Sequence, residues 1–158
     1  MPMPEEYWLE RVSRIRKFVR DGRSAPHKPL LLLFALGRLQ RFGENTFIAY
    51  REAEPQLQTL LDTYWRENST NPSYPFIRLA NDGLWEVTSN SDAEITDTPS
   101  SLKQHDARGR LSPPFANDLL AEPLLLKRCA LLLLKNEFPE VDRPNVARDV
   151  GLNLEDFA

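Results

Sequence analysis

The stretch APHKPLLLLFALGRLQ, residues 25–40, decides the fold. Two prolines, Pro26 and Pro29, suit the entrance of a helix, where a missing backbone N–H costs nothing. The residues after them are apolar on almost every side. The helix, predicted from about residue 26 or 28 to residue 41, should therefore be central and buried. His27 and Lys28 would then lie at a fixed helix end, where free backbone N–H groups favour an anion.

The chain on either side predicts more helices and a small sheet. Apolar residues at helical spacing predict helices over residues 5–19, 54–65, 112–120 and 122–136. Residues 46–50 are predicted to form a strand, and residues 74–79 and 84–87 a hairpin around a turn at 81–83. We expect an α+β fold: a mainly helical single domain with a small antiparallel β-sheet, over residues 1–139. Residues 140–158 are expected to be a C-terminal tail or the start of a linker.

Composition indicates an ordinary folded protein with uneven charge. The 158 residues are 41% hydrophobic, enough for one domain with a core, and the net charge is −3. Residues 11–41 nevertheless carry nine basic residues against one acidic residue, Asp21. This local positive charge suits either a solvated helix face or an anionic partner. A single cysteine, Cys129, is predicted to be a buried thiol. We expect no membrane span, no signal peptide and a cytoplasmic location.

No pattern indicates an enzyme. The two histidines, His27 and His105, are far apart in sequence and belong to no metal-binding motif. The acidic residues Asp92, Glu94 and Asp97 are interpreted as a solvated loop. We therefore expect no catalytic residues, no metal, no cofactor and no small-molecule substrate.

The tripeptide Tyr74-Pro75-Phe76 has two interpretations. It could be a strand at the edge of the core, with the proline at an edge or a bulge. It could equally form a small rigid apolar wall at the surface, with Arg78 and Lys28 adding positive charge near it. His27 also has two interpretations. Its side chain could bond the backbone of its own helix end, or it could contact an anion.

The two stretches APHKPLLLLFALGRLQ (25–40) and SYPFIRLANDGLWEV (73–87) together resemble the sulfur-binding domain of phosphorothioate-dependent, type IV, McrA-like HNH restriction endonucleases. The resemblance covers most of the chain, from about residue 5 to residue 136. It implies binding of double-stranded DNA in which sulfur replaces a non-bridging backbone oxygen. It also implies a recognition module without the nuclease active site, joined in full-length members to an HNH nuclease domain.

The resemblance also implies which residues form the site. Tyr74 and Pro75 would be the walls of the sulfur pocket, Phe76 would support it from behind, and His27 and Lys28 would lie beside it. Lys28 stands where the family typically has arginine. The remaining expected DNA contacts come from basic and polar residues: Arg78, Ser73, Asn71, Arg23, Lys103, Arg108 and Arg110. Asn68 and Ser69 are further candidates for reading bases.

Two other functions fit the same residues. An ordinary DNA-binding domain would use the basic stretch to hold unmodified DNA, and would bind equally with or without sulfur. A protein-interaction module would use the Tyr-Pro-Phe patch on another protein, and would show little salt-dependent binding to DNA.

Overall fold

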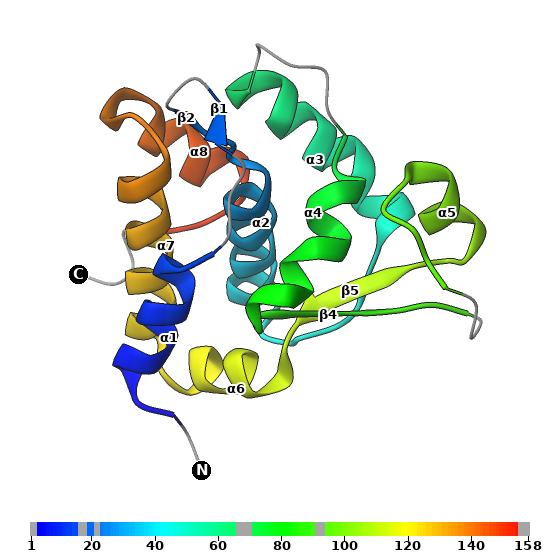
Figure 1. The fold of residues 1–158 in the computed structure, drawn as a ribbon. Coiled ribbons are helices and arrows are strands. Elements are labelled where there is room, and N and C mark those ends of the chain that lie inside the picture. Colours follow the sequence, from blue (N-terminus) through cyan, green and yellow to red (C-terminus); the bar gives the residue numbers. More distant parts are fainter. Residues whose placement is uncertain (1–2, 16–18, 21–22, 66–70, 91–93, 155–158) are drawn as a thin grey trace.

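A computed structural model describes residues 3–15, 19–20, 23–65, 71–90 and 94–154, apart from the side chains of residues 19, 20, 23 and 24. Helix α2 (His27–Phe42) runs through the middle of the molecule (Figure 1). Twelve of its sixteen residues are buried. Gly43 ends it in the left-handed conformation, with φ of 68°, and donates its N–H to the Leu39 carbonyl. The predicted central helix is thus confirmed with its bounds.

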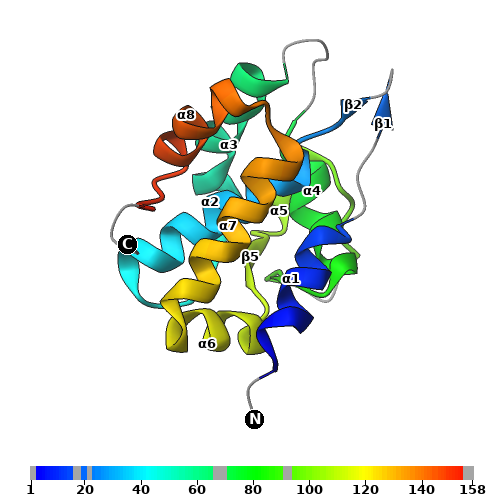
Figure 2. The same ribbon diagram turned by 90° about the vertical axis from the view of Figure 1, so that its left-hand side faces the viewer.

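The other elements pack around α2. Helices α1 (Glu5–Ser13) and α7 (Pro123–Glu137) lie together on one side, and α3 (Tyr50–Tyr64) and α4 (Ser73–Arg78) on the other (Figure 1). Figure 2 shows α7 in front of α2, with α6 (Pro113–Ala121) at one end. A short helix, α5 (Pro99–Gln104), and a two-stranded ribbon, β1 (Val19–Arg20) with β2 (Arg23–Ser24), complete this arrangement.

A small antiparallel sheet lies under α4. Its order is β3 (Ile48–Ala49), β5 (Arg108–Leu111) and β4 (Trp85–Thr88), so β5 is central. The indole ring of Trp85 on β4 packs over Gly109 on β5, where an added Cβ would lie 2.2 Å from the ring. The mainly helical α+β fold with a small antiparallel sheet is confirmed, as is the buried thiol of Cys129, whose pKa burial raises to about 12.

The predicted hairpin is wrong. Residues 73–78 form α4, a 3₁₀ helix (η1, Leu79–Asp82) follows, and β4 pairs with β5 instead of its sequence neighbour. Pro75 lies in the first helical turn, where no backbone N–H is needed. Phe76 and Leu79, three residues apart, are fully buried, so one helical face packs inward. Asn71, just before the Pro72 N-cap, accepts a hydrogen bond from the Ser73 N–H at 3.1 Å.

Two predicted helices have different bounds. The first helix ends at Ser13, with Arg14 as its C-cap, instead of at residue 19, and residues 19–20 pair with residues 23–24. The third begins at Tyr50, four residues before the predicted start. Tyr50 donates its backbone N–H to the Ala107 carbonyl at 2.9 Å and is fully buried, so tertiary contacts begin this helix.

The last described residues pack against α2. Helix α8 (Arg143–Asp149), preceded by the 3₁₀ turn η2 (Glu140–Asp142), buries Val146, and Val150 follows it into the core. Gly37 of α2 permits close contact, since a Cβ there would lie 2.2 Å from the Val150 carbonyl oxygen. Residues 143–152 therefore contribute to the packed domain, and a linker to a further domain stays a prediction.

A buried ion pair joins the beginning of α2 to η1. The Lys28 Nζ lies 2.7 Å from a carboxylate oxygen of Asp82, and the two side chains are 7% and 5% exposed. The pair fixes the first turn of α2 against the segment that leads from α4 to the sheet. In the described ranges, no helix is long and apolar enough to cross a membrane.

We expect Lys28→Met to lower the free energy of unfolding by about 3 kcal/mol, because it leaves the buried Asp82 carboxylate without its ammonium partner. The double variant Lys28→Met/Asp82→Leu removes both charges and should recover most of that loss. Urea unfolding followed by circular dichroism measures both values. A single variant as stable as the parent would contradict a buried pair at this position.

Candidate functional site

His27 lies in the first turn of α2, next to the end of α3. The His27 ring, in the first turn of α2, packs edge-on against Trp65, with 6.1 Å between ring centroids. Trp65 directly follows α3, and α2 also packs against α4. His27 is 9% exposed. Helix α2, which begins with His27, therefore packs against the helix that carries Tyr74 and Pro75.

Burial changes the acid–base behaviour of His27. Loss of water lowers its pKa below the ordinary value of 6.5, because the charged imidazolium is poorly solvated there. The unfolded chain takes up a proton near pH 6.5, whereas the folded protein resists it. Above that pH, His27 therefore does not lower the free energy of unfolding. As the pH falls through 6.5 toward the lowered pKa, His27 lowers the free energy of unfolding.

Tyr74, Pro75 and Phe76 divide between surface and core. Tyr74 is 42% exposed, whereas Phe76 is fully buried and Pro75 is buried. Phe76 packs edge-on against Tyr50 and Trp85, with centroid distances of 5.1 and 5.6 Å. The Trp85 indole N–H donates to the Phe76 carbonyl at 2.9 Å. Phe76 thus anchors α4 from behind, and Tyr74 presents its ring at the surface.

Arg78 lies beside Tyr74 as a half-exposed cation. Four residues separate them on α4, so they share one helix face. The guanidinium carbon lies 4.8 Å from the Tyr74 ring centroid. Its Nε also lies 3.0 Å from a carboxylate oxygen of Asp97. Asp97 thus lies in a loop, as expected, but its carboxylate is ion-paired with α4 instead of only solvated.

Ser73 and Asn71 have structural partners at the start of α4. Ser73 is fully buried, and its hydroxyl donates to the Asp97 carbonyl at 2.8 Å. It also hydrogen-bonds the Asn71 side chain. These bonds tie the loop containing Asp97 to the helix that carries Tyr74. Ser73 therefore shapes the site from inside, and Asn71 remains exposed at its edge.

The other predicted basic contacts lie elsewhere and are paired with carboxylates. Lys28 faces Asp82 inside the protein. The remaining cations pair at the surface: Lys103 with Glu54 at 2.7 Å, Arg108 with Asp106 at 3.0 Å, and Arg110 with Glu86 at 2.5 Å. The side chain of Arg23, and residues Asn68 and Ser69, lie outside the described part of the chain.

The structure adds two residues that sequence reasoning missed. Trp65 packs on His27 across the helix ends, and Asp97 holds Arg78 from the loop before α5. Asp97 precedes Thr98, whose hydroxyl caps α5 by accepting from the Ser101 N–H. The Thr98-Pro99 pair is a helix-start signal that could have placed Asp97 near a helix end. Its partner on α4 depends on tertiary packing and has no sequence signal.

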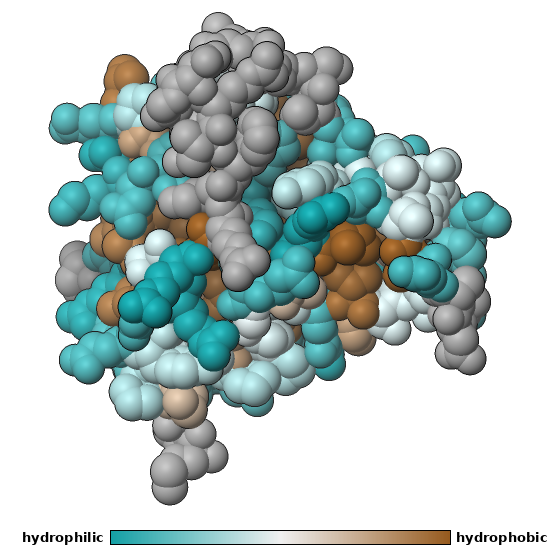
Figure 3. All heavy atoms as spheres, viewed as in Figure 1, coloured by the Kyte–Doolittle hydropathy of each residue, from teal (hydrophilic) through white to brown (hydrophobic). Residues whose placement is uncertain are grey.

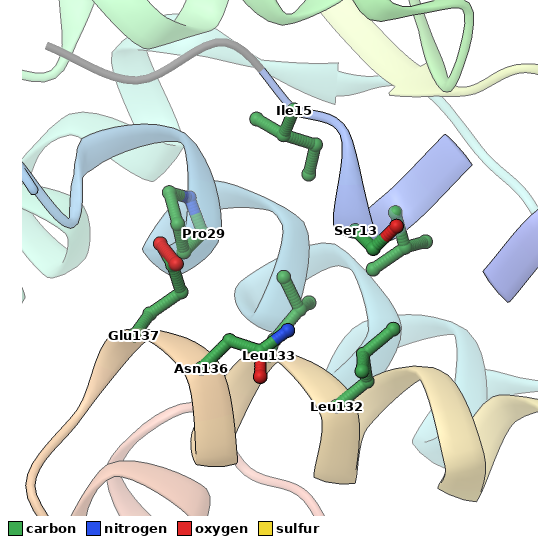
Figure 4. A pocket seen from close by; sticks show the side chains of 8 residues that line it. Ser13, Ile15, Pro29, Leu132, Leu133, Asn136 and Glu137 are labelled. Carbon is green, nitrogen blue, oxygen red and sulfur yellow. The ribbon is translucent and has the colours of Figure 1, made fainter. Parts of the chain in front are cut away.

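The hydropathy of the surface around α4 is mixed. Figure 3 shows mostly hydrophilic residues on the face that carries α4, with a hydrophobic area between α4 and α5. A separate small pocket lies between the end of α1, the start of α2 and the end of α7 (Figure 4). Figure 4 shows the carboxylate of Glu137 turned toward Pro29. The described lining of this pocket includes no cation, so it does not suit a phosphate.

Comparisons with known proteins identify the family and the fold. Residues 5–155 match the family described as ScoMcrA-like, DNA sulfur-binding domain. The sulfur-binding domain of SprMcrA complexed with phosphorothioated DNA has 26% sequence identity and a TM-score of 0.78, covering 99% of this chain and 98% of that one. No curated protein matches.

Two further structures share the fold. The sulfur-binding domain of ScoMcrA complexed with phosphorothioated DNA has 24% identity and a TM-score of 0.79, covering 92% of this chain and 95% of that one. The type IV phosphorothioation-dependent restriction endonuclease ScoMcrA has 22% identity and a TM-score of 0.74, with 91% of this chain matching 32% of the enzyme. Since the family match spans nearly the whole sequence, this chain belongs to the ScoMcrA-like DNA sulfur-binding domains.

Proposed function

We propose that this chain binds phosphorothioated double-stranded DNA. The observation that carries the proposal is the family match over residues 5–155. The exposed Tyr74 ring, the buried Pro75 beside it and the adjacent Arg78 support it, because they combine apolar surface with positive charge. The solved sulfur-binding domains of SprMcrA and ScoMcrA are complexes with phosphorothioated DNA.

The chemistry of the linkage explains why such a surface can select sulfur. A phosphorothioate keeps its negative charge, but its sulfur is larger, more polarizable and a poorer hydrogen-bond acceptor than oxygen. Oxygen placed against Tyr74 and Pro75 would lose hydrogen bonds to water worth roughly 1–3 kcal/mol. Sulfur loses less and gains apolar contact at about 25 cal/mol per Å². The wall therefore discriminates mainly by penalising oxygen.

The positive charge beside the wall is assigned to Arg78. Its guanidinium is half-exposed and held over Tyr74, whereas the Lys28 ammonium is buried against Asp82. We assign Lys28 a structural role in positioning His27, and Phe76 the role of supporting Tyr74 and Pro75. Lys103, Arg108, Arg110, Arg23 and Asn71 stay candidates for neighbouring DNA contacts. Ser73 is buried and is assigned the role of shaping the site from inside.

We further propose that the domain guides a nuclease domain in a longer chain, in the cytoplasm, and has no nuclease activity of its own. Its match to 32% of ScoMcrA, a restriction endonuclease, supports a larger enzyme of which such a domain is one part. The solved pairing of a sulfur-binding domain with an SRA domain in ScoMcrA also fits a modular protein.

Matched duplexes test the sulfur preference. Binding is measured by fluorescence anisotropy for duplexes with oxygen, Rp sulfur or Sp sulfur at one position, over a salt series. A pocket on one side of the phosphate can face only one non-bridging atom, so we expect one sulfur diastereomer to bind most tightly. Tyr74→Ala and Pro75→Ala should each reduce its preference over oxygen at least fivefold. Equal binding of all three duplexes by the parent protein would refute the proposal.

Two control variants separate local from general effects. Phe42 is 59% exposed and lies beneath Arg38 and Arg41, so Phe42→Ala removes another aromatic ring next to cations. Pro123 lies in the first turn of α7, as Pro75 does in α4, although Pro123 is exposed and Pro75 is buried. Phe42→Ala and Pro123→Ala should leave the sulfur preference unchanged. Binding to every duplex that is weak and insensitive to salt would instead favour a protein-interaction module.

Acidification should strengthen binding through His27. An anion beside the imidazole favours its protonated form, so the pKa of His27 should be higher in the complex than in the free protein, where burial lowers it. A higher pKa in the complex means proton uptake on binding, and affinity therefore rises as pH falls from 7.5 to 6. His27→Gln should remove this slope and His105→Gln should preserve it. A slope that survives His27→Gln would assign the titration to another group.

A further inference from the structure

Asp97 lies between the candidate binding surface and the protein's interior. Its backbone carbonyl accepts the hydrogen bond from the buried Ser73 hydroxyl, at 2.8 Å. Its carboxylate reaches Arg78 at 3.0 Å and is 29% exposed. An acidic side chain is thus anchored at a surface that would have to accept a polyanion.

Asp97 accepts a hydrogen bond from only one of the nitrogens of the Arg78 guanidinium. The ion pair uses Nε, and among the described residues no hydrogen bond from the Nη groups is present. Asp97 is also the one carboxylate in the described part of the chain within ion-pair distance of Arg78. Arginine can bind a phosphate through two parallel N–H donors, so a phosphate could approach Arg78 through these Nη groups.

A phosphate approaching Arg78 therefore meets Asp97 in either possible geometry. If it binds the Nη groups, it lies close to the carboxylate and the two negative charges repel each other. If it takes the Nε donor as well, it must displace Asp97 from the ion pair. Both geometries weaken the grip of Arg78 on the DNA backbone.

We propose that Asp97 competes with DNA phosphate for Arg78 and so sets the affinity of the domain for the DNA backbone. The inference rests on the proposed function. Oxygen and sulfur linkages carry the same charge, so Asp97 lowers the affinity for both by a similar factor and leaves their ratio unchanged. The apolar wall of Tyr74 and Pro75 sets the ratio. A weaker phosphate grip also shortens each stay on unmodified DNA, since most affinity differences reside in the dissociation rate.

The test measures Asp97→Asn against the parent protein on the oxygen and preferred-sulfur duplexes, over a salt series. We expect roughly two- to fivefold tighter binding to both duplexes, the range associated with an exposed charge pair. The slope of log affinity against log salt should steepen by up to about 0.9, because Arg78 then neutralises a phosphate fully. Asp97→Ala should behave in the same way. Unchanged or weaker binding by both variants would overturn the proposal.

Two further comparisons locate the effect at Arg78. In the Arg78→Ala background, Asp97→Asn should change affinity less than twofold, because the residue for which Asp97 competes is gone. Glu5→Gln is the matched control: it frees Arg128 from an ion pair of 2.5 Å with similar exposure, and it changes the net charge equally. An equal gain from Glu5→Gln, or an undiminished gain in the Arg78→Ala background, would also overturn the proposal. If the parent protein binds the oxygen and sulfur duplexes equally tightly, the proposed function is refuted. That outcome does not depend on how the Asp97 variants compare with the parent.

Discussion

Burial of most of α2 is the constraint on which the rest of the structure depends. A helix that is apolar nearly all round must be enclosed, and α3, α4, α6 and α7 supply the enclosing layer, with Val150 packed against Gly37. Enclosure fixes the helix end as well as its middle. The Lys28–Asp82 pair adds an electrostatic attachment at the first turn, where 7% and 5% of the two side chains are exposed. His27, one residue earlier, therefore has a defined place.

The second part of the site depends on the first through α4. This helix is only six residues long, so its own hydrogen bonds cannot hold it. Phe76 anchors it by packing on Tyr50 and Trp85, and the Trp85 indole N–H bonds the Phe76 carbonyl. The Trp85 ring in turn packs over Gly109, and a larger residue at position 109 would displace the ring. The position of the exposed Tyr74 ring is thus set by a chain of buried contacts that reaches the sheet.

Charge at the surface is more balanced than the sequence suggests. Arg78, Lys103, Arg108 and Arg110 each face a carboxylate, so a polyanion must compete with the protein's own acidic groups for them. Exposed pairs of this kind are weak and easily exchanged in water. Binding DNA would then replace one set of weak ion pairs with another. Such an exchange gives a contact with apolar surface, such as the wall of Tyr74 and Pro75, more influence on selectivity.

The sequence by itself determined the central helix, the two C-terminal core helices and the fold class, because their apolar residues recur at helical spacing over nine residues or more. It also indicated His27, Tyr74 and Pro75 as site residues, through a resemblance carried by two short stretches. Only the tertiary structure decided that residues 73–78 are helical, since a six-residue apolar segment fits either a strand or a helix until its partners are known. The same holds for the charges. Lys28 turns inward and Arg78 outward because Asp82 and Asp97, distant in sequence, lie where folding brings them.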